Sequence, residues 1–371
     1  MTDGRPPSKR PHRIAVDAMG GDHAPREIVR GAVLAASEYP VSILLIGREE
    51  DVRRELGEIE GAVPPNIEVV DAREVVEMSD TALSPLRRKK NSSIRVCANF
   101  VAEGLASALV SAGNTGAAWT SARMVMGMIE GVDRPALAAL LPRIGGRTVI
   151  LDVGANVDSK PRHLRQFAVM AHFYAQMVLG IERPRIGLMS IGEEEGKGNE
   201  LTRQSFKVMQ EAGLNFIGNA EGRDVYNGNA DVIVCDGFIG NVVLKASESL
   251  AEMVSQTLKD ELTRTPIRKL GAFLARNAFS DMKKRLDYSE TGGAPLLGVK
   301  GGCVICHGRS SSKAIKNAIR VAADFVENQI DEKIRTGIRD LHSYEREEGL
   351  GISGDKNAEA PDSGAGDRNG H

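Results

Sequence analysis

Short apolar runs alternate along the chain with longer segments in which apolar residues recur every three or four positions. The short runs predict β-strands, and the longer segments predict amphipathic helices. We expect strands at residues 14–17, 41–47, 67–70, 107–111, 136–141, 148–153, 185–190, 216–218 and 232–235. We expect helices at residues 25–37, 115–128, 161–179, 200–211, 241–262 and 311–335. This alternation is typical of an α/β fold with a mostly parallel sheet and helices on both faces.

The two ends of the chain lack this pattern. Residues 1–12 are polar, basic and proline-rich, and residues 346–371 are rich in glycine, aspartate, asparagine and serine. Segments of such composition bury too little apolar surface to fold, so we predict a disordered tail at each end. Residues 13–345 are predicted to form the α/β domain, which is long enough to bury a large core.

Composition and charge narrow the classes of function. The formal net charge of −2 gives no argument for nucleic-acid binding. No apolar run approaches the roughly 20 residues that a membrane-spanning helix needs. The four cysteines, without a secretory signal, favour a reducing cytoplasm. We therefore expect a cytoplasmic protein that meets a membrane, if at all, from its surface.

Loops rich in glycine, asparagine and aspartate follow many of the predicted strands. They lie at residues 17–25, 111–116, 152–156, 192–199, 236–241 and 307–312. Each loop alone is explained by turn chemistry and helix capping. Ligands of open α/β sheets, however, bind at the carboxyl ends of the strands. We therefore expect these loops to share one edge of the sheet and to form one cleft rich in N–H donors.

The first of these loops carries acids as well as glycines. A strand, a glycine turn and a helix bring backbone N–H groups close to a bound anion, and Gly20 and Gly21 fit that arrangement. Asp17 and Asp22 make the turn more acidic than a phosphate-binding loop requires. We interpret these acids as turn-stabilising or proton-handling groups, and expect the positive charge to come from other loops.

Three loops offer candidate cations. Lys197 lies between Gly196 and Gly198, and is either a cation near an anionic substrate or a loop lysine paired with neighbouring glutamates. Lys245 lies one helical turn after Asn241, so both side chains face the same way. The alternative for Lys245 is an ordinary solvated helix residue.

The loop at 307–312 opens a long helix with three consecutive serines, of which Ser310 is the first. These serines are good N-cap candidates, and with Arg309 the helix start could hold an anion. Cys303 and Cys306 precede His307 in a C-x-x-C-H pattern that is also found at haem attachment sites. We reject haem attachment because residues 303–306 resemble a buried strand and because the sequence shows no export signal. Zinc would need two more ligands, and no catalytic thiol is indicated.

The segment 264–285 is basic and amphipathic. Ile267, Leu270, Phe273 and Leu274 lie on one face of a predicted helix, and seven basic residues accompany a single acid. The segment is either a core-facing helix or dimer contact, or a surface that docks a membrane or an acidic carrier protein.

Taken in order, these motifs resemble one family. They include Val16-Asp-Ala-Met-Gly-Gly-Asp22, Ser111-Ala-Gly-Asn-Thr-Gly116, Asp152-Val-Gly-Ala-Asn156, Gly196-Lys-Gly-Asn-Glu200, Gly218-Asn219, Asp236-Gly-Phe-Ile-Gly-Asn-Val-Val-Leu-Lys245, Gly293-Ala-Pro-Leu-Leu-Gly298 and His307-Gly-Arg-Ser310. The set spans nearly the whole predicted domain and resembles the PlsX family, the phosphate acyltransferases of bacterial phospholipid synthesis.

The resemblance implies an activity and its setting. An acyl group would move from acyl carrier protein, or acyl-CoA, to inorganic phosphate and give acyl phosphate. A three-layer α/β/α fold related to isocitrate dehydrogenase and phosphate acetyltransferase is implied. The resemblance also implies a homodimer and peripheral association with the inner face of the cell membrane. It further implies that a glycerol-3-phosphate acyltransferase receives the product. We expect no cofactor, no metal and no nucleic-acid partner.

The resemblance also assigns residues. Lys197 and Asn241 match family positions thought important for activity, and we add His307 as a third catalytic candidate. The predicted substrate-binding residues are Asp17, Gly20, Gly21, Asp22, Asn114, Thr115, Gly116, Asn156, Gly198, Asn219, Asp236, Gly237, Lys245 and Ser310. Two alternatives stay open: a nicotinamide-dependent decarboxylating dehydrogenase of related fold, and a non-enzymatic scaffold on the membrane. The sequence contains no G-x-G-x-x-G fingerprint of the kind that opens a dinucleotide-binding unit, which argues against the dehydrogenase.

Overall fold

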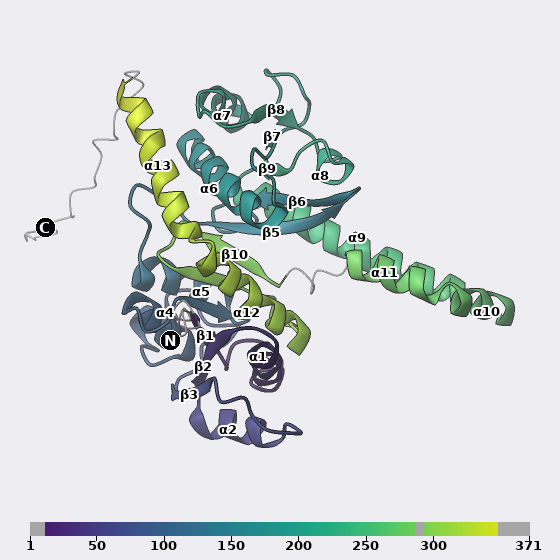
Figure 1. Ribbon diagram of the computed structural model, residues 1–371. Helices are drawn as coiled ribbons and strands as arrows, with labels where there is room; N and C mark the ends of the chain where they lie inside the picture. The colour runs from purple at the N-terminus through teal and green to yellow at the C-terminus, as the bar shows by residue number, and fades with distance from the viewer. Residues whose placement is uncertain (1–11, 287–291, 348–371) are drawn as a thin grey trace, which may run out of the picture.

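The computed structural model describes residues 12–286 and 292–347 (Figure 1). In this part of the chain one eleven-stranded sheet has the strand order β3-β2-β1-β4-β11-β10-β5-β6-β9-β7-β8. The strands are β1 (His12–Asp17), β2 (Val41–Gly47), β3 (Ile67–Asp71), β4 (Ala108–Ser111), β5 (Ala136–Arg143), β6 (Gly146–Leu151), β7 (Ile186–Met189), β8 (Phe216–Ala220), β9 (Val232–Val234), β10 (Ala294–Leu297) and β11 (Gly302–Ile305).

The sheet consists of two parallel halves. Strands β3, β2, β1, β4 and β11 run parallel to one another, and so do β6, β9, β7 and β8. Between them, β10 is antiparallel to β11 and β5, and β5 is antiparallel to β6. Three reversals leave the two halves running in opposite directions.

Helices cover both faces of the sheet, which confirms the predicted three-layer α/β/α fold (Figure 1). The helices are α1 (Arg26–Glu38), α2 (Glu49–Gly57), α3 (Ser84–Arg87), α4 (Ser93–Ala102), α5 (Thr115–Ser121), the π-helix η1 (Ala122–Met126), α6 (Pro161–Leu179), α7 (Glu200–Gln210), α8 (Asp224–Asn227), α9 (Gly237–Thr263), α10 (Pro266–Leu274), α11 (Arg276–Leu286), α12 (Ser312–Glu327) and α13 (Ile330–Glu347). On one face, α4, α5, α8 and α9 share a core cluster, whereas α1, α2, α6, α7, α12 and α13 fill two clusters on the other.

Local patterns explain most of these elements. Helix α6 has the predicted bounds, and all nine predicted strands are present with shifts of one or two residues at their ends. The helix predicted at 311–335 is interrupted, because α12 ends at Glu327 and Gln329 adopts a left-handed φ of 52° before α13 begins. Strand β10 was not predicted, since its four residues include a proline that breaks the strand pattern.

Helices α9, α10 and α11 project away from the body of the molecule (Figure 1). In α9 only Gly237 and Gly240 are buried, and no residue of α10 is buried. The helical prediction for 264–285 is confirmed, but the segment does not face the core of this chain. Beyond the domain, β1 begins at His12 and α13 extends through residue 347, so each predicted tail is slightly too long. The rest of both predicted tails lies outside the described residues.

Candidate active site in two loop clusters

The loops that follow β1, β4 and β11 converge at the carboxyl edge of the first half, and we call them the first cluster. The Asp22 N–H donates to the Gly308 carbonyl over 2.8 Å. A Cβ on Gly20 would lie 2.5 Å from Asp17 Oδ2 and 2.7 Å from the Gly113 nitrogen. Because real Cβ atoms do not approach so closely, glycine is required at position 20 for these loops to meet.

Asp17 is the buried centre of the first cluster. Its carboxylate accepts a hydrogen bond of 2.7 Å from the Ser111 hydroxyl and one of 3.3 Å from the Met19 N–H. The Ser111 oxygen in turn accepts the Gly113 N–H over 3.1 Å. Burial raises the pKa of the Asp17 carboxyl, and hydrogen bonds from Ser93 and Ser111 oppose that rise.

Asn114 connects this cluster to the segment between β3 and α4. Its Oδ1 accepts the Ala117 N–H over 3.0 Å and caps α5, while its Nδ2 donates to the carbonyls of Met78 and Asp80 at 3.1 and 3.0 Å. The next two residues begin α5, where Thr115 is exposed and Gly116 is half-buried. A pocket too small to hold a water molecule is lined by Asp17, Met19, Gly20, Val76, Ser93, Ile94, Ser111, Gly113, Asn114 and Ala117.

The loop after β11 supplies a helix start. Ser311, rather than Ser310, is the N-cap of α12, and its hydroxyl accepts the Ala314 N–H over 3.4 Å. Ser310 is buried, whereas His307 and Arg309 are exposed, and His307 Nδ1 accepts the Arg309 N–H over 3.3 Å. Helices α1, α5 and α12 thus begin at one edge, where their N–H groups and dipoles favour an anion.

The loops that follow β6, β9 and β7 form a second cluster at the carboxyl edge of the other half. Its buried centre is Asp152, whose carboxylate accepts the N–H groups of Leu137, Ala155 and Asn156 at 3.0, 2.9 and 2.7 Å. The Asn156 side-chain amide also donates to Asp152, at 2.9 Å, and to the Pro135 carbonyl, at 2.7 Å. Burial raises the pKa of Asp152, and these N–H groups oppose that rise.

The start of α9 packs directly on this loop. Asp236 caps the helix by accepting the Ile239 N–H over 3.0 Å, and the Gly237 N–H donates to the Asn156 carbonyl over 2.7 Å. A Cβ on Gly240 would lie 1.8 Å from the Asp152 carbonyl oxygen, so the helix cannot accept a larger residue there. Gly240 was not among the predicted site residues, although its place in the Gly-Phe-Ile-Gly run is the signal that could have found it.

Asn241 and Lys245 follow on the same helix. Asn241 is exposed, and its side chain lies 3.8 Å from the Cβ position of Gly154, so it borders the Asp152 loop. Lys245 is exposed and pairs with Glu248 over 2.8 Å. This ion pair agrees with the alternative interpretation of Lys245 as a solvated helix residue.

Lys197 lies at the tip of the loop after β7. Its side chain is exposed and pairs with neither Glu194 nor Glu195, although its backbone N–H donates to the Glu194 carbonyl over 3.0 Å. Gly198, at φ 101°, provides the turn, and Asn219 Nδ2 anchors the loop by donating to the Glu194 carbonyl over 2.7 Å. The surrounding structure therefore positions the loop but leaves the ammonium group available.

Three oxygen atoms of the second cluster have no hydrogen-bond partner among the described residues. They are Asn156 Oδ1, Asn219 Oδ1 and Ser190 Oγ, and both asparagines are more than nine-tenths buried. Ser190 follows β7 directly and was not predicted, because a single serine after a strand is an ordinary turn residue.

The two clusters divide the predicted residues between them. The first brings together Asp17, Gly20, Gly21, Asp22, Asn114, Thr115, Gly116, His307 and Ser310. The second brings together Asn156, Lys197, Gly198, Asn219, Asp236, Gly237, Asn241 and Lys245. The hydrogen bonds described above stay within one cluster or the other. The structure thus shows these local groupings, and the single cleft stays a prediction.

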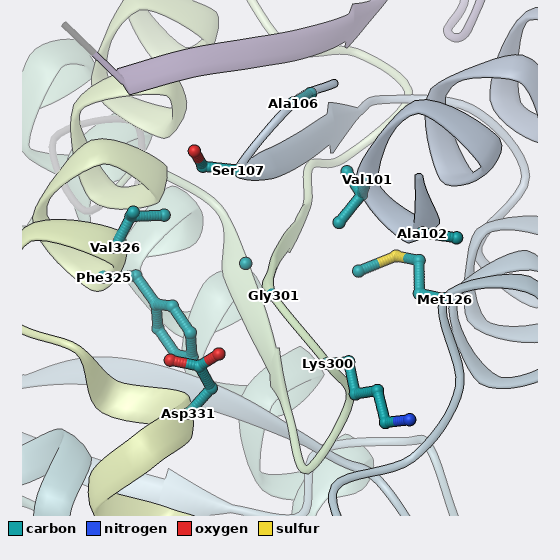
Figure 2. A pocket seen from close by; sticks show the side chains of 11 residues that line it. Val101, Ala102, Ala106, Ser107, Met126, Lys300, Gly301, Phe325, Val326 and Asp331 are labelled. Atoms are coloured by element: carbon teal, nitrogen blue, oxygen red, sulfur yellow. The ribbon is translucent and has the colours of Figure 1, made fainter. Parts of the chain in front are cut away.

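Other features of the chain lie apart from both clusters. A pocket of about 290 Å³ lies at the amino ends of β4 and β11, where Met126 and Phe325 form apolar walls and Lys300 and Asp331 lie at its border (Figure 2). All four cysteines are buried and free, and burial raises the pKa of Cys303 and Cys306 to about 12. Across the described ranges, no three His, Cys, Asp or Glu side chains form a group able to hold a metal ion.

Known proteins match nearly the whole domain. The model of a family described as "Fatty acid synthesis protein" matches residues 12–333. The phosphate acyltransferase of Pelotomaculum thermopropionicum is 54% identical over 329 residues, which cover 89% of this chain and 96% of that protein. The phosphate acyltransferase of Desulfitobacterium hafniense (strain DCB-2) is 50% identical over 324 residues, covering 87% of this chain and 96% of that protein.

A solved structure shares the fold. A phosphotransacetylase from Streptococcus pyogenes superposes with a TM-score of 0.59 and covers 85% of this chain and 94% of that one. At 16% sequence identity, this likeness concerns the fold alone.

Proposed function

This chain belongs to the phosphate acyltransferase family, and from that premise we propose that it transfers a fatty acyl group from acyl carrier protein to inorganic phosphate. The products are acyl phosphate and the free carrier protein. Acyl phosphate is an activated acyl donor, and we propose that a membrane glycerol-3-phosphate acyltransferase of phospholipid synthesis consumes it.

The reaction needs no side-chain nucleophile. A phosphate oxygen attacks the thioester carbonyl carbon, a C–O bond forms, the C–S bond breaks, and the leaving sulfur takes the proton that phosphate gives up. The protein must hold phosphate beside the thioester and stabilise the oxyanion on the carbonyl. The buried cysteines, whose pKa values burial raises, agree with a mechanism that does not use a thiolate of the protein.

The two clusters suit different parts of this task. In the first, the starts of α1, α5 and α12 offer N–H groups to phosphate, and Asp17 or His307 handles its proton. In the second, the Lys197 ammonium and Asn241 stabilise the negative charge that develops during transfer. The observation that carries the proposal is Lys197, an exposed cation positioned by a glycine turn and an anchored loop and engaged in no ion pair with its neighbouring glutamates.

The test is incubation with palmitoyl-carrier protein and phosphate, with free thiol and acyl phosphate measured together. Removal of one charge-stabilising donor typically raises the barrier by roughly 2.7–4 kcal/mol, so we expect Lys197→Ala to lower turnover about 10²- to 10³-fold. Undiminished turnover with an unchanged phosphate KM would end the role given to Lys197. Absence of phosphate-dependent thiol release by the wild type would refute the activity itself.

We propose that α9 forms the contact of a homodimer. Leu250, Met253 and Val254 lie three and four positions apart on this helix and are all exposed in the single chain. A 27-residue helix with so little of its surface buried is stabilised when a second copy covers its apolar face. Leu250→Glu with Met253→Glu should give a monomer in analytical ultracentrifugation, and an unchanged mass would exclude this helix as the interface.

We propose that α10 and the start of α11 associate with the inner face of the cell membrane in the cytoplasm. Ile267, Leu270 and Phe273 are 85%, 62% and 60% exposed, and basic residues of the same segment suit anionic lipid headgroups. Among the described helices none is long and apolar enough to cross a bilayer. Leu270→Glu with Phe273→Glu should abolish binding to anionic vesicles and leave soluble activity intact. Ile144→Glu, at a residue 78% exposed outside this segment, is the control.

A further inference from the structure

The chain between β3 and α4 forms a long closed loop over the first cluster. Residues 74–92 contain no helix longer than the four residues of α3. The loop is closed where the Glu74 N–H donates to the Asn91 carbonyl and the Ser93 N–H donates to the Glu74 carbonyl, both over 3.2 Å. Connections of this length within a compact domain are uncommon and are often functional.

The loop is held in place from inside and from below. The Lys89 ammonium donates to the Val75 carbonyl over 2.7 Å and pairs with Asp80 across the loop. From below, Asn114 donates to the carbonyls of Met78 and Asp80. Because Val76 also lines the pocket that contains Asp17, the loop is one wall of the first cluster.

The loop carries exposed cations, and the charge of one of them, Arg88, contributes to lowering the pKa of the Asp80 carboxyl. Arg87, Arg88 and Lys90 are exposed, and none forms an ion pair with another residue that the structure describes. Lys89, which lies between Arg88 and Lys90 in the sequence, instead forms an ion pair with Asp80 within the loop. The loop has one exposed acid, Glu77, and three exposed cations, so its exposed charge is net positive.

Exposed apolar side chains adjoin these cations. Met78 and Leu83 are 53% and 41% exposed, and both belong to the same loop. An apolar centre beside a rim of positive charge is the arrangement of a protein docking surface, whereas a bare charge run is only solvated. This surface differs from α10, where large apolar residues are more exposed and are interleaved with the basic ones.

We propose that the loop 74–92 is the docking surface for the acidic protein that carries the acyl thioester. The inference rests on the proposed function, because it identifies where the acyl donor meets this chain. Arg87, Arg88 and Lys90 attract the acidic surface and orient it. The thioester arm then has to reach only the exposed start of α5 at Thr115, because Asn114 holds that helix start against the loop.

The test compares two acyl donors on one triple variant, Arg87→Glu with Arg88→Glu and Lys90→Glu. One donor is palmitoyl-carrier protein, and the other is an uncharged palmitoyl thioester of N-acetylcysteamine. We expect kcat/KM for the carrier protein to fall at least about tenfold, mainly through KM, because charge complementarity governs encounter. With the uncharged donor kcat/KM should stay unchanged. Added salt should lower the wild-type rate with the carrier protein and leave the rate of the variant nearly constant.

Lys207→Glu with Lys333→Glu is the matched control, since both lysines are exposed on other helices, α7 and α13. It should leave both donors unaffected. Retention of carrier-protein activity by the triple variant would overturn the inference, and so would equal loss with both donors, which would show that the loop only supports the pocket. Failure of the wild type to release thiol from either donor would instead refute the proposed function.

Discussion

The two halves of the sheet each bury an aspartate at the carboxyl end of a strand, and the two aspartates have different partners. Asp17, at the end of β1, accepts a serine hydroxyl and lines a pocket. Asp152, directly after β6, accepts three backbone N–H groups within 3.0 Å and a side-chain amide, and α9 lies against it. Burial raises the pKa of both carboxyls.

The difference leads us to predict a structural role for Asp152 and a chemical role for Asp17. The named partners of Asp152 are N–H groups of strand β5 and of the loop after β6, so the carboxylate connects that strand to the second cluster. Asp17 accepts a hydrogen bond from the Ser111 hydroxyl, and we propose that its carboxyl exchanges a proton with phosphate at the first cluster. The two residues share burial and the direction of their pKa shift, and we predict different roles for them from their different hydrogen-bond partners.

The largest expected effect is on folding, at Asp152. Asp152→Ala leaves buried N–H groups of Leu137, Ala155 and Asn156 without an acceptor, and should lower the free energy of unfolding by about 3–5 kcal/mol. Chemical denaturation of the purified variant measures this. A loss below about 1 kcal/mol would show that Asp152 does not organise the second cluster.

At Asp17 the main expected effect is on catalysis. Asp17→Asn keeps the shape of the side chain and an acceptor for the Ser111 hydroxyl but cannot exchange a proton. Turnover should therefore fall about 10²-fold, within the range for loss of a general acid or base, while the fold is retained. Phosphate-dependent thiol release and circular dichroism together measure the two properties. Wild-type turnover would place Asp17 with Asp152 as a structural residue.

A smaller effect is expected where α9 packs on the second cluster. A Cβ at Gly240 would meet the Asp152 carbonyl, so Gly240→Ala should cost about 1–3 kcal/mol of stability through overpacking. Gly271→Ala in α10 is the control, because nothing lies within 4 Å of its Cβ position and alanine favours helix. Equal melting temperatures for the two variants would contradict the close packing of α9 on Asp152.

The smallest expected effect is a pH dependence of stability at Asp17. Burial raises the pKa of this carboxyl above 3.8, so the folded state holds the proton more tightly than the unfolded chain. Stability is therefore lost as pH rises from 3.8 through the folded-state pKa. Asp17→Asn removes that loss and should raise the melting temperature at neutral pH but not in strong acid. A difference in melting temperature that is constant with pH would show no linkage to this group.

Sequence patterns located the loops of the site but did not place them relative to one another. The strands at 41–47 and 232–235 and the helix at 161–179 were predictable because apolar periodicity is a local property. The opposite directions of the two halves were not predictable, since they depend on the antiparallel pairing of β10 with β11 and β5 and of β5 with β6. Strand order depends on pairing between residues far apart in the chain, which periodicity does not encode.

By itself, then, the sequence determined the fold class, the family and the polar loops at the strand ends, because these depend on local spacing and on residue type. Only the tertiary structure decided which loops lie together, and it grouped Asp17 with Asn114 and His307 but Lys197 with Asn219. It also decided that Asp17 borders a pocket while Asp152 is enclosed under α9. The physical reason is that burial and hydrogen-bond partners come from neighbours in space, and those neighbours are set by the packing of distant segments.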